Sequence, residues 1–141
     1  MDKMTGNTFD LTRNVTFNPD YDLSPYNKYA GVINFQNGML INKSITFDGK
    51  GYTISGLNQA RIFTITESNV NLINTNFINA SSSTNGGALY LNEGVTDLTV
   101  SGCLFENNHA DAYGGAIYQG GQGNNIKITD TAFNKNTAAD G

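Results

Sequence analysis

The sequence predicts an all-β protein that folds as a parallel β-helix of about three to four rungs with an N-terminal cap. Two observations predict this fold: a repeat with a constant period, and apolar residues that alternate with polar ones inside each copy. Short strands that recur at a fixed period are typical of the coils of a parallel β-helix. Neighbouring copies must stack, because one coil alone cannot bury enough apolar surface to offset the entropy of ordering it.

The repeat is clearest in two stretches, FINASSSTNGGALY (77–90) and FENNHADAYGGAIY (105–118), where a phenylalanine precedes a glycine pair at equal separation. Phe77, Phe105 and Phe133 follow one another at equal intervals along the chain. The same interval relates Gly86 to Gly114, Ala88 to Ala116, Tyr90 to Tyr118, Val70 to Leu98 and Ile126, Leu72 to Val100 and Ile128, and Thr75 to Cys103 and Thr131. This alignment without gaps indicates that the copies keep one register.

An earlier copy is present in SITFDGKGY, and it is slightly shorter than the copies that follow it. The residues expected to take the places of Val70, Leu72 and Phe77 in it are Ile45, Phe47 and Tyr52. We therefore expect residues 1–44 to form an N-terminal cap and a first irregular rung, and residues 45–141 to form the β-helix repeats. The last stretch, FNKNTAADG, begins a further copy and stops where its glycine pair would follow, so the repeats are expected to be truncated mid-repeat.

Each copy is expected to form strands rather than helices. Apolar residues alternate in DLTVSGCLF and in NIKITDTAF, which is the period of a strand with one buried face. β-Branched residues dominate these runs, and Gly, Asn and Asp interrupt them every few residues. Asparagine is in clear excess, and together with the many glycines it favours turns and stacked amides over helices.

Aligned residues of successive rungs lie about 4.8 Å apart, so the alignment predicts vertical columns of side chains. One aromatic column is expected to be buried, and an amide ladder is expected at the turn that follows it. Their residues are Phe77, Phe105 and Phe133 with Tyr52 beneath them, and Asn108 with Asn136. Both columns are interpreted as structural, because packing and amide stacking explain them without a ligand.

The glycine pairs are expected to serve the backbone rather than a ligand. The pairs at 86–87 and 114–115 lead into strands, where a positive φ or a tight bend would exclude a side chain. A phosphate-binding loop would need a following helix and a lysine, and both are missing. Cys103 aligns with two threonines and is expected to be a small buried residue. A nucleophilic role for it is not expected, because His109, the one histidine, has no aligned partner.

The two ends of the β-helix are expected to behave differently. An open first rung would expose apolar side chains and unpaired strands, so the N-terminal segment is expected to cover or extend it. Its apolar contacts are expected from Phe9, Leu11, Val15 and Phe17. At the other end, the strand predicted over residues 126–133 has no following copy, and its unpaired edge is expected to support end-to-end self-association.

The composition argues against several function classes. Charged residues make up 14% of the chain and the formal net charge is -4, so no basic face is available to neutralise the phosphates of nucleic acid. The single cysteine excludes an intrachain disulfide. No apolar run is long enough to span a bilayer, and MDKMTGNTFDL lacks the apolar core of a secretion signal.

Metal ions and cofactors are not expected either. Calcium sites on glycine-rich β-rolls repeat aspartates at fixed offsets. The aspartates Asp48, Asp97, Asp111 and Asp130 do not recur in one column. Asp20 and Asp22 lie together in NPDYDLSPY, but two carboxylates near a proline are usually solvated.

The motif FENNHADAYGGAIY resembles the F-x-x-N and G-G-A-I repeat of polymorphic outer-membrane proteins. The run from INKSITFDGKGY to DAYGGAIY (41–118) is similar to the adhesin-like surface proteins of methanogenic archaea. The resemblance covers about residues 30–141 and, loosely, the NTFDLTRNVTF opening. It implies a right-handed parallel β-helix displayed on the outside of the cell, in the N-terminal part of a longer surface protein.

Together these features favour a non-catalytic adhesin module that attaches to a glycan or protein of another cell. If Leu89 and Ile117 point inward, then Tyr90 and Tyr118 point outward and form an aromatic strip on which sugar rings can stack. The alternative is that both tyrosines face the core with their hydroxyls at the rim. A second candidate is the non-repetitive insertion NPDYDLSPYNKYAG, because recognition concentrates in such loops. Its tyrosines are Tyr21, Tyr26 and Tyr29.

The competing hypothesis is a carbohydrate-active β-helix enzyme, either a polysaccharide lyase or a glycoside hydrolase. Such an enzyme needs paired carboxylates that flank a glycosidic bond, or a base together with calcium. Carboxylates are sparse and unaligned in this chain, and Arg13 and Arg61 are the only arginines. We therefore expect no enzymatic activity and assign no catalytic residue.

Overall fold

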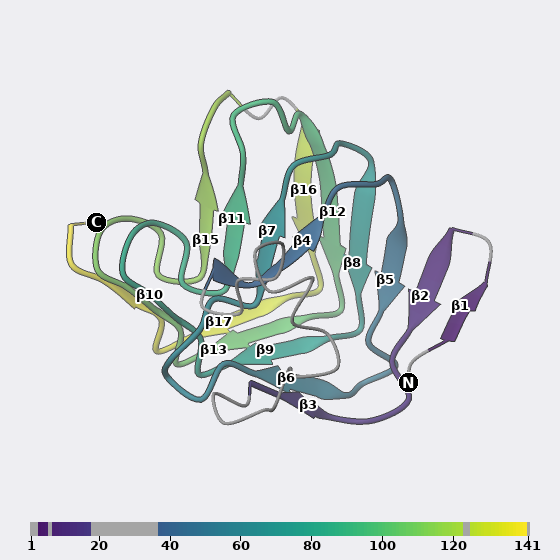
Figure 1. Ribbon diagram of the computed structural model, residues 1–141, viewed down its shortest axis with the longest axis horizontal. Helices are drawn as coiled ribbons and strands as arrows, with labels where there is room; N and C mark the ends of the chain where they lie inside the picture. The colour runs from purple at the N-terminus through teal and green to yellow at the C-terminus, as the bar shows by residue number, and fades with distance from the viewer. Residues whose placement is uncertain (1–2, 6, 18–36, 123–124, 141) are drawn as a thin grey trace, which may run out of the picture.

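The chain folds as an all-β solenoid of about 4 turns, which confirms the predicted fold class (Figure 1). The structure, a computed structural model, describes residues 3–5, 7–17, 37–122 and 125–140. These residues contain short strands and turns and no α-helix. Successive turns of the chain stack so that strands far apart in the sequence lie side by side.

Four sheets, which we name A to D, run along the solenoid. Sheet A contains β1 (Lys3–Thr5), β2 (Thr8–Asp10), β5 (Thr46–Asp48), β8 (Val70–Ile73), β12 (Asp97–Ser101) and β16 (Asn125–Thr129). Sheet B contains β3 (Val15–Thr16), β6 (Thr53–Ser55), β9 (Asn76–Ile78), β13 (Leu104–Glu106) and β17 (Ala132–Asn134). Sheet C contains β4 (Met39–Ile41), β7 (Phe63–Ile65), β11 (Leu89–Leu91) and β15 (Ile117–Gln119). Sheet D contains β10 (Ser81–Ser82), β14 (His109–Ala110) and β18 (Thr137–Ala138).

The strands of the regular rungs pair in parallel and in the register that the repeat predicts. Leu98 pairs with Val70 below it and with Ile126 above it in sheet A. Strand β1 is the exception to parallel pairing, because it folds back antiparallel onto β2 at the edge of sheet A. Register is thus fixed by the hydrophobic pattern, since a slip by one residue would turn every buried side chain outward.

The shorter early copy follows the prediction in sheet A and departs from it in sheet B. Phe47 pairs with Leu72 as expected, but Ile54 and not Tyr52 pairs with Phe77. The cause is a turn at residues 49–51, where the amide of Tyr52 donates to the carbonyl of Gly49 at 2.7 Å. This turn adds two residues between the sheets, so Tyr52 lies outside the aromatic column and is 38% exposed.

The N-terminal segment supplies strands to the same sheets as the repeats. Strand β2 extends sheet A beyond β5, and β3 and β4 extend sheets B and C. Leu11 is buried in the core, and Phe9 and Val15 pack against the core cluster. The Phe9 ring stacks on Phe47 with centroids 5.3 Å apart, while the backbone amide of Phe17 donates to Ser55. These residues therefore extend the solenoid by an irregular rung.

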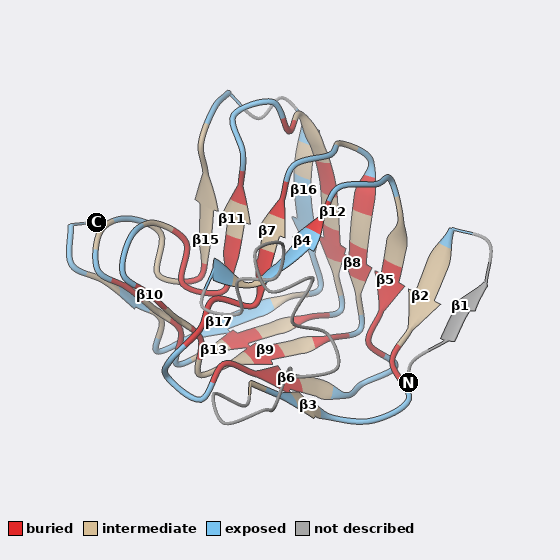
Figure 2. Cartoon of the chain, in the orientation of Figure 1, coloured by how far each residue is buried: buried red, intermediate tan, exposed pale blue. Residues whose placement is uncertain are grey.

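The buried apolar residues form one continuous core cluster. Figure 2 shows in red the buried positions along the stacked strands. The rings of Phe77 and Phe105 stack with centroids 4.9 Å apart, and those of Phe105 and Phe133 stack at 5.0 Å. Phe63 of sheet C meets Phe77 edge to face at 5.8 Å, and Ile54 takes the place below Phe77 where Tyr52 was expected. Phe77 and Phe105 are fully buried, whereas Phe133 is 49% exposed on the edge strand β17.

An amide ladder accompanies the aromatic column at the next corner. The side-chain amide of Asn108 donates to the Asn136 side-chain oxygen at 2.9 Å and to the carbonyl of Phe77 at 3.0 Å. Its oxygen accepts the amide of Ala80 at 2.9 Å. Asn136 repeats the pattern one rung higher by donating to the carbonyl of Phe105 at 2.9 Å. Asn108 is fully buried, and these bonds replace the water that its amide loses on folding.

The asparagine excess is explained partly by the corners between sheets. Several corner residues have a left-handed backbone, which most side chains resist and which Asn and Gly adopt readily. Two such corners recur once in each regular rung: Asn74, Gly102 and Asp130 with φ of 50°, 65° and 48°, and Asn79, Asn107 and Lys135 with φ of 51°, 54° and 55°. The corners turn the chain at the same point in each of these rungs.

Candidate functional site: an outward tyrosine pair

Tyr90 of β11 and Tyr118 of β15 form a stacked pair on the outer face of sheet C. They are direct partners in the parallel register, and their ring centroids lie 5.4 Å apart at an interplanar angle of 26°. Leu89 and Leu91 on either side of Tyr90 are fully buried, which sets the tyrosine on the opposite face of the strand. Both tyrosines are half-buried, so each ring keeps part of its surface in solvent.

The glycine pairs bring the chain into these two strands. Gly86 and Gly114 have φ of 73° and 70°, a conformation that favours glycine. Gly87 has a different reason to lack a side chain, because a Cβ there would overlap the carbonyl oxygen of Gly115 in the next rung. The first glycine of each pair therefore makes the turn, and the second lets successive backbones approach.

Arg61 holds the loop that leads into the tyrosine pair. Its side chain is only 7% exposed, although it carries a charge. Its acceptors are the carbonyls of Gly86 (2.9 Å), Asn85 (2.7 Å) and Asn37 (3.3 Å) and the hydroxyls of Ser82 (2.9 Å), Thr84 (3.1 Å) and Thr64 (3.2 Å). No carboxylate of the described residues forms an ion pair with it. Carbonyls and hydroxyls alone thus satisfy the guanidinium.

Arg61 also packs against the ring of Tyr90. Its guanidinium carbon lies 5.0 Å from the centroid of the Tyr90 ring, within range of a cation–π contact. Burial lowers the pKa of Arg61 from its ordinary value, and Tyr90 acts in the opposite direction. Tyr90 is therefore held between Arg61 and Tyr118. No positioning role was expected for Arg61 from the sequence, because it stands in a rung that lacks the glycine pair and has no counterpart in the later copies.

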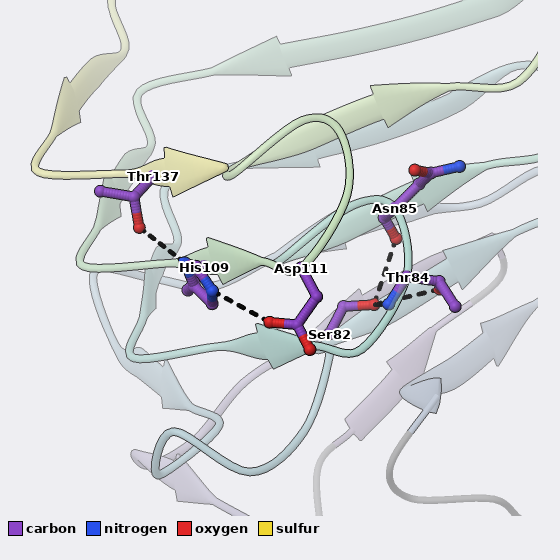
Figure 3. A network of polar contacts seen from close by, with 6 residues as sticks. All are labelled: Ser82, Thr84, Asn85, His109, Asp111 and Thr137. Atoms are coloured by element: carbon purple, nitrogen blue, oxygen red, sulfur yellow. Dashed lines mark hydrogen bonds and ion pairs between the residues drawn. The ribbon is translucent and has the colours of Figure 1, made fainter. Parts of the chain in front are cut away.

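A second polar group lies around sheet D (Figure 3). Nδ1 of His109 lies 2.7 Å from the Thr137 hydroxyl, and Nε2 lies 3.1 Å from a carboxylate oxygen of Asp111. The series hydroxyl, imidazole, carboxylate has the composition of a nucleophile with its base. The His109 and Asp111 side chains are 45% and 62% exposed, so water screens both contacts. No aligned partner was expected for His109 from the sequence; the structure places Thr137 above it.

Cys103 does not contribute a reactive group. It is buried, and its thiol lies 3.5 Å from the carbonyl of Leu72 and 3.4 Å from that of Ser101. Burial raises the pKa of the Cys103 thiol, which disfavours the nucleophilic thiolate. Among the described residues, no group of three or more His, Cys, Asp or Glu side chains is arranged to hold a metal ion.

The sequence analysis named three further candidate tyrosines in the non-repetitive insertion. Tyr21, Tyr26 and Tyr29 lie outside the described residues. The described part of the chain contains no helix with the length and apolarity that a membrane span requires.

Comparison with known proteins matches one copy of the repeat. Residues 102–120 match the Chlamydia polymorphic membrane protein repeat, a stretch that holds Phe105, the second glycine pair and Tyr118. Neither the curated proteins nor the solved structures give a significant match to the chain. The chain therefore carries a repeat of the polymorphic membrane protein type, stacked into a solenoid.

Proposed function

We propose that this chain is a non-catalytic adhesive module of a cell-surface protein, and that Tyr90 and Tyr118 bind glycans of another cell. The observation that carries the proposal is the outward stack of the two rings on sheet C, partly exposed to solvent and with Arg61 packed against the ring of Tyr90. A core role would explain neither their outward direction nor the residues that position them.

The chemistry of the pair suits a sugar ring. The face of an aromatic ring is electron-rich, and it attracts the weakly positive C–H groups on one side of a pyranose. Strand β15 is the edge of sheet C, and among the described residues no second ring stacks on the side of Tyr118 away from Tyr90. The hydroxyls of the two tyrosines add hydrogen-bonding groups at the rim of this surface.

The matched repeat supports the cellular setting. The family that residues 102–120 match is named for a membrane protein, and the resemblance to adhesin-like surface proteins points to the same side of the cell. Because β-helices carry many unrelated functions, the adhesive role depends on the tyrosine pair and not on the fold.

Two of the ionisable groups, Arg61 and Asp48, are engaged in a way that favours the non-catalytic role. The guanidinium of Arg61 is buried and fully engaged, so it has no free nitrogen to act on a substrate. Asp48 is buried and pairs with Lys50 at 3.0 Å. The alternative, a polysaccharide lyase or glycoside hydrolase, needs an accessible acid and base poised around one glycosidic bond.

A glycan array tests the proposal with matched tyrosine variants. The wild-type chain is expected to bind a subset of glycans, and Tyr118→Ala is expected to weaken that binding at least about tenfold, or about 1.4 kcal/mol. Tyr113→Ala is the control, because Tyr113 is 51% exposed but lies outside the stacked pair. Equal binding by all three chains would contradict the assignment of the site. New reducing ends or unsaturated products in the incubated glycans would instead support the enzymatic alternative.

A further inference from the structure

A polar hollow of about 360 Å³ lies on the outer face of sheet A, a different sheet from that of the tyrosine pair. It spans the three strands β8, β12 and β16, which lie side by side in Figure 1. Its lining side chains are Asn69, Asn71, Asp97, Thr99, Asn125 and Lys127. Val70 and Leu98 also border it, but their side chains point into the core, so they contribute backbone only.

The repeat itself arranges this lining into two columns. Thr99 pairs with Asn71 below and with Lys127 above, which gives one column across three rungs. Asp97 pairs with Asn125 to form a second column, two residues and about 7 Å away along the strands. Together the columns present amide, hydroxyl, carboxylate and ammonium groups at intervals of about 4.8 Å along the solenoid.

The central strand beneath the hollow is already paired, which limits what can bind over it. Strand β12 bonds to β8 on one side and to β16 on the other, so a peptide strand could add only at the outer edge of β16, beside the hollow. The lining has no apolar side chain that could anchor an apolar ligand. Recognition must therefore come from side-chain hydrogen bonds, and the ligand must offer many donors and acceptors over a small area.

Asp97 and Lys127 are the two charged residues of the hollow, and both can form hydrogen bonds to a ligand. One carboxylate oxygen of Asp97 accepts from the Asn125 amide at 2.9 Å, and the other accepts from the Thr96 hydroxyl at 2.9 Å. The carboxylate is thus fixed in place while its oxygens keep lone pairs for further donors. Within the described part of the chain, Lys127 forms no ion pair, and its ammonium group has donors available. One negative and one positive group leave the hollow without net charge.

We propose that this hollow is a second glycan site, which binds a neutral oligosaccharide of hexose units by hydrogen bonds. Hydroxyl groups both donate and accept, so they can pair with the Asp97 carboxylate and the Lys127 ammonium at once. Stacked amides of adjacent rungs bind successive units of the same saccharide. The site does not depend on the tyrosine pair, which lies on sheet C and uses aromatic faces instead.

Amide chemical shifts of the 15N-labelled full chain test the proposal, with cellotriose, maltotriose and mannotriose as neutral probes and trigalacturonate as a charged comparison. At least one neutral trisaccharide is expected to shift the amides of residues 69–71, 97–99 and 125–127 in a saturable way. Thr99→Phe fills the hollow and is expected to weaken this binding about tenfold. Lys127→Gln removes one charged donor and is expected to weaken it about fivefold.

Two exposed residues outside both sites serve as controls for general surface and charge effects. Tyr113→Ala and Lys135→Gln, which changes an exposed lysine just after β17, are both expected to leave the affinity unchanged. If Thr99→Phe does not fold, Lys127→Gln against Lys135→Gln still decides the outcome. The proposal is overturned if no neutral trisaccharide shifts these amides, if trigalacturonate alone binds, or if the shifts gather around Tyr118 instead.

Discussion

The inward phenylalanine column and the outward tyrosine pair are built by the same repeat and have nearly the same geometry. Ring centroids lie 4.9 and 5.0 Å apart in the column of Phe77, Phe105 and Phe133, and 5.4 Å apart in the pair of Tyr90 and Tyr118. Their burial differs, because Phe77 and Phe105 are fully buried while both tyrosines keep surface in solvent. Stacking distance follows from the spacing of the rungs and does not identify function.

In a solenoid, the face of the strand decides what a repeated side chain does. On the inner face, a stack excludes water and contributes to the free energy of unfolding. On the outer face, the same stack removes less surface from water and leaves the remainder for a ligand. Four changes to the chain separate these two roles, with the largest expected effect first.

Phe105→Ala is expected to lower the free energy of unfolding by about 3–5 kcal/mol, because it leaves a cavity between two rings of the buried column. Urea denaturation measures the loss. Tyr118→Ala is the matched variant on the outer face, and its loss is expected to stay below about 1 kcal/mol. A loss below about 1 kcal/mol for Phe105→Ala would mean that the column does not support the core.

Asn108→Ala is expected to lower the free energy of unfolding by about 2–4 kcal/mol. The change leaves the amide of Ala80 and the carbonyl of Phe77 buried without their partner, and each such group costs about 1–3 kcal/mol. Urea denaturation again gives the value. Asn134→Ala is the control, because that side chain is exposed and, among the described residues, bonds only to Glu106. Equal losses for the two variants would show that the ladder contributes no more than a surface amide.

Arg61→Met is expected to loosen the loop before the tyrosine pair while the rungs above it stay folded. The carbonyls of Gly86 and Asn85 lose their donor, and bonds to a charged group are worth about 1.5–3 kcal/mol each in such settings. Hydrogen exchange should accelerate at residues 82–88 and remain slow in β12 and β13. Uniform acceleration through all sheets would contradict a local role for Arg61. No acceleration at all would show that the loop is stable without Arg61.

Asp48→Asn is expected to change how the free energy of unfolding depends on pH. Burial acts to raise the pKa of Asp48, but hydrogen bonds from the backbone and side chain of Lys50 and from Asn74 outweigh it, and the pKa lies below its ordinary value. The carboxylate therefore stabilises the fold above about pH 4, and this contribution is lost as pH falls through the lowered pKa. Urea midpoints between pH 6 and pH 2 should fall less steeply for the variant. Parallel curves would contradict the linkage.

The sequence predicts the parts of this molecule that repeat and misses the parts that do not. A constant repeat period and alternation within each copy were enough to predict the solenoid and the register of the regular rungs. Tyr52 was misplaced because the turn at residues 49–51 adds two residues, and turn length does not alter the hydrophobic pattern on either side. The alignment could therefore match Phe47 correctly and still fail at the next strand.

For a related reason, the sequence did not reveal most of the residues that form or position the candidate sites. Arg61 acts once, in a rung without the glycine pair, so no column marks it. The hollow on sheet A has the opposite problem, because Asn71, Thr99 and Lys127 do align but differ in chemistry. A pattern of like residues is easy to detect, whereas a set of unlike polar residues becomes a site only when the folded strands bring it together.

One paired measurement tests most directly whether the inner face carries stability and the outer face carries binding. Phe105→Leu and Tyr118→Leu make the same replacement on the two faces, and each variant is measured by urea denaturation and on the glycan array. We expect Phe105→Leu to lose about 1–2 kcal/mol of stability and to keep its affinity. We expect Tyr118→Leu to keep its stability within about 0.5 kcal/mol and to bind about tenfold more weakly. Equal losses of stability, or undiminished binding by Tyr118→Leu, would contradict this division between the two faces.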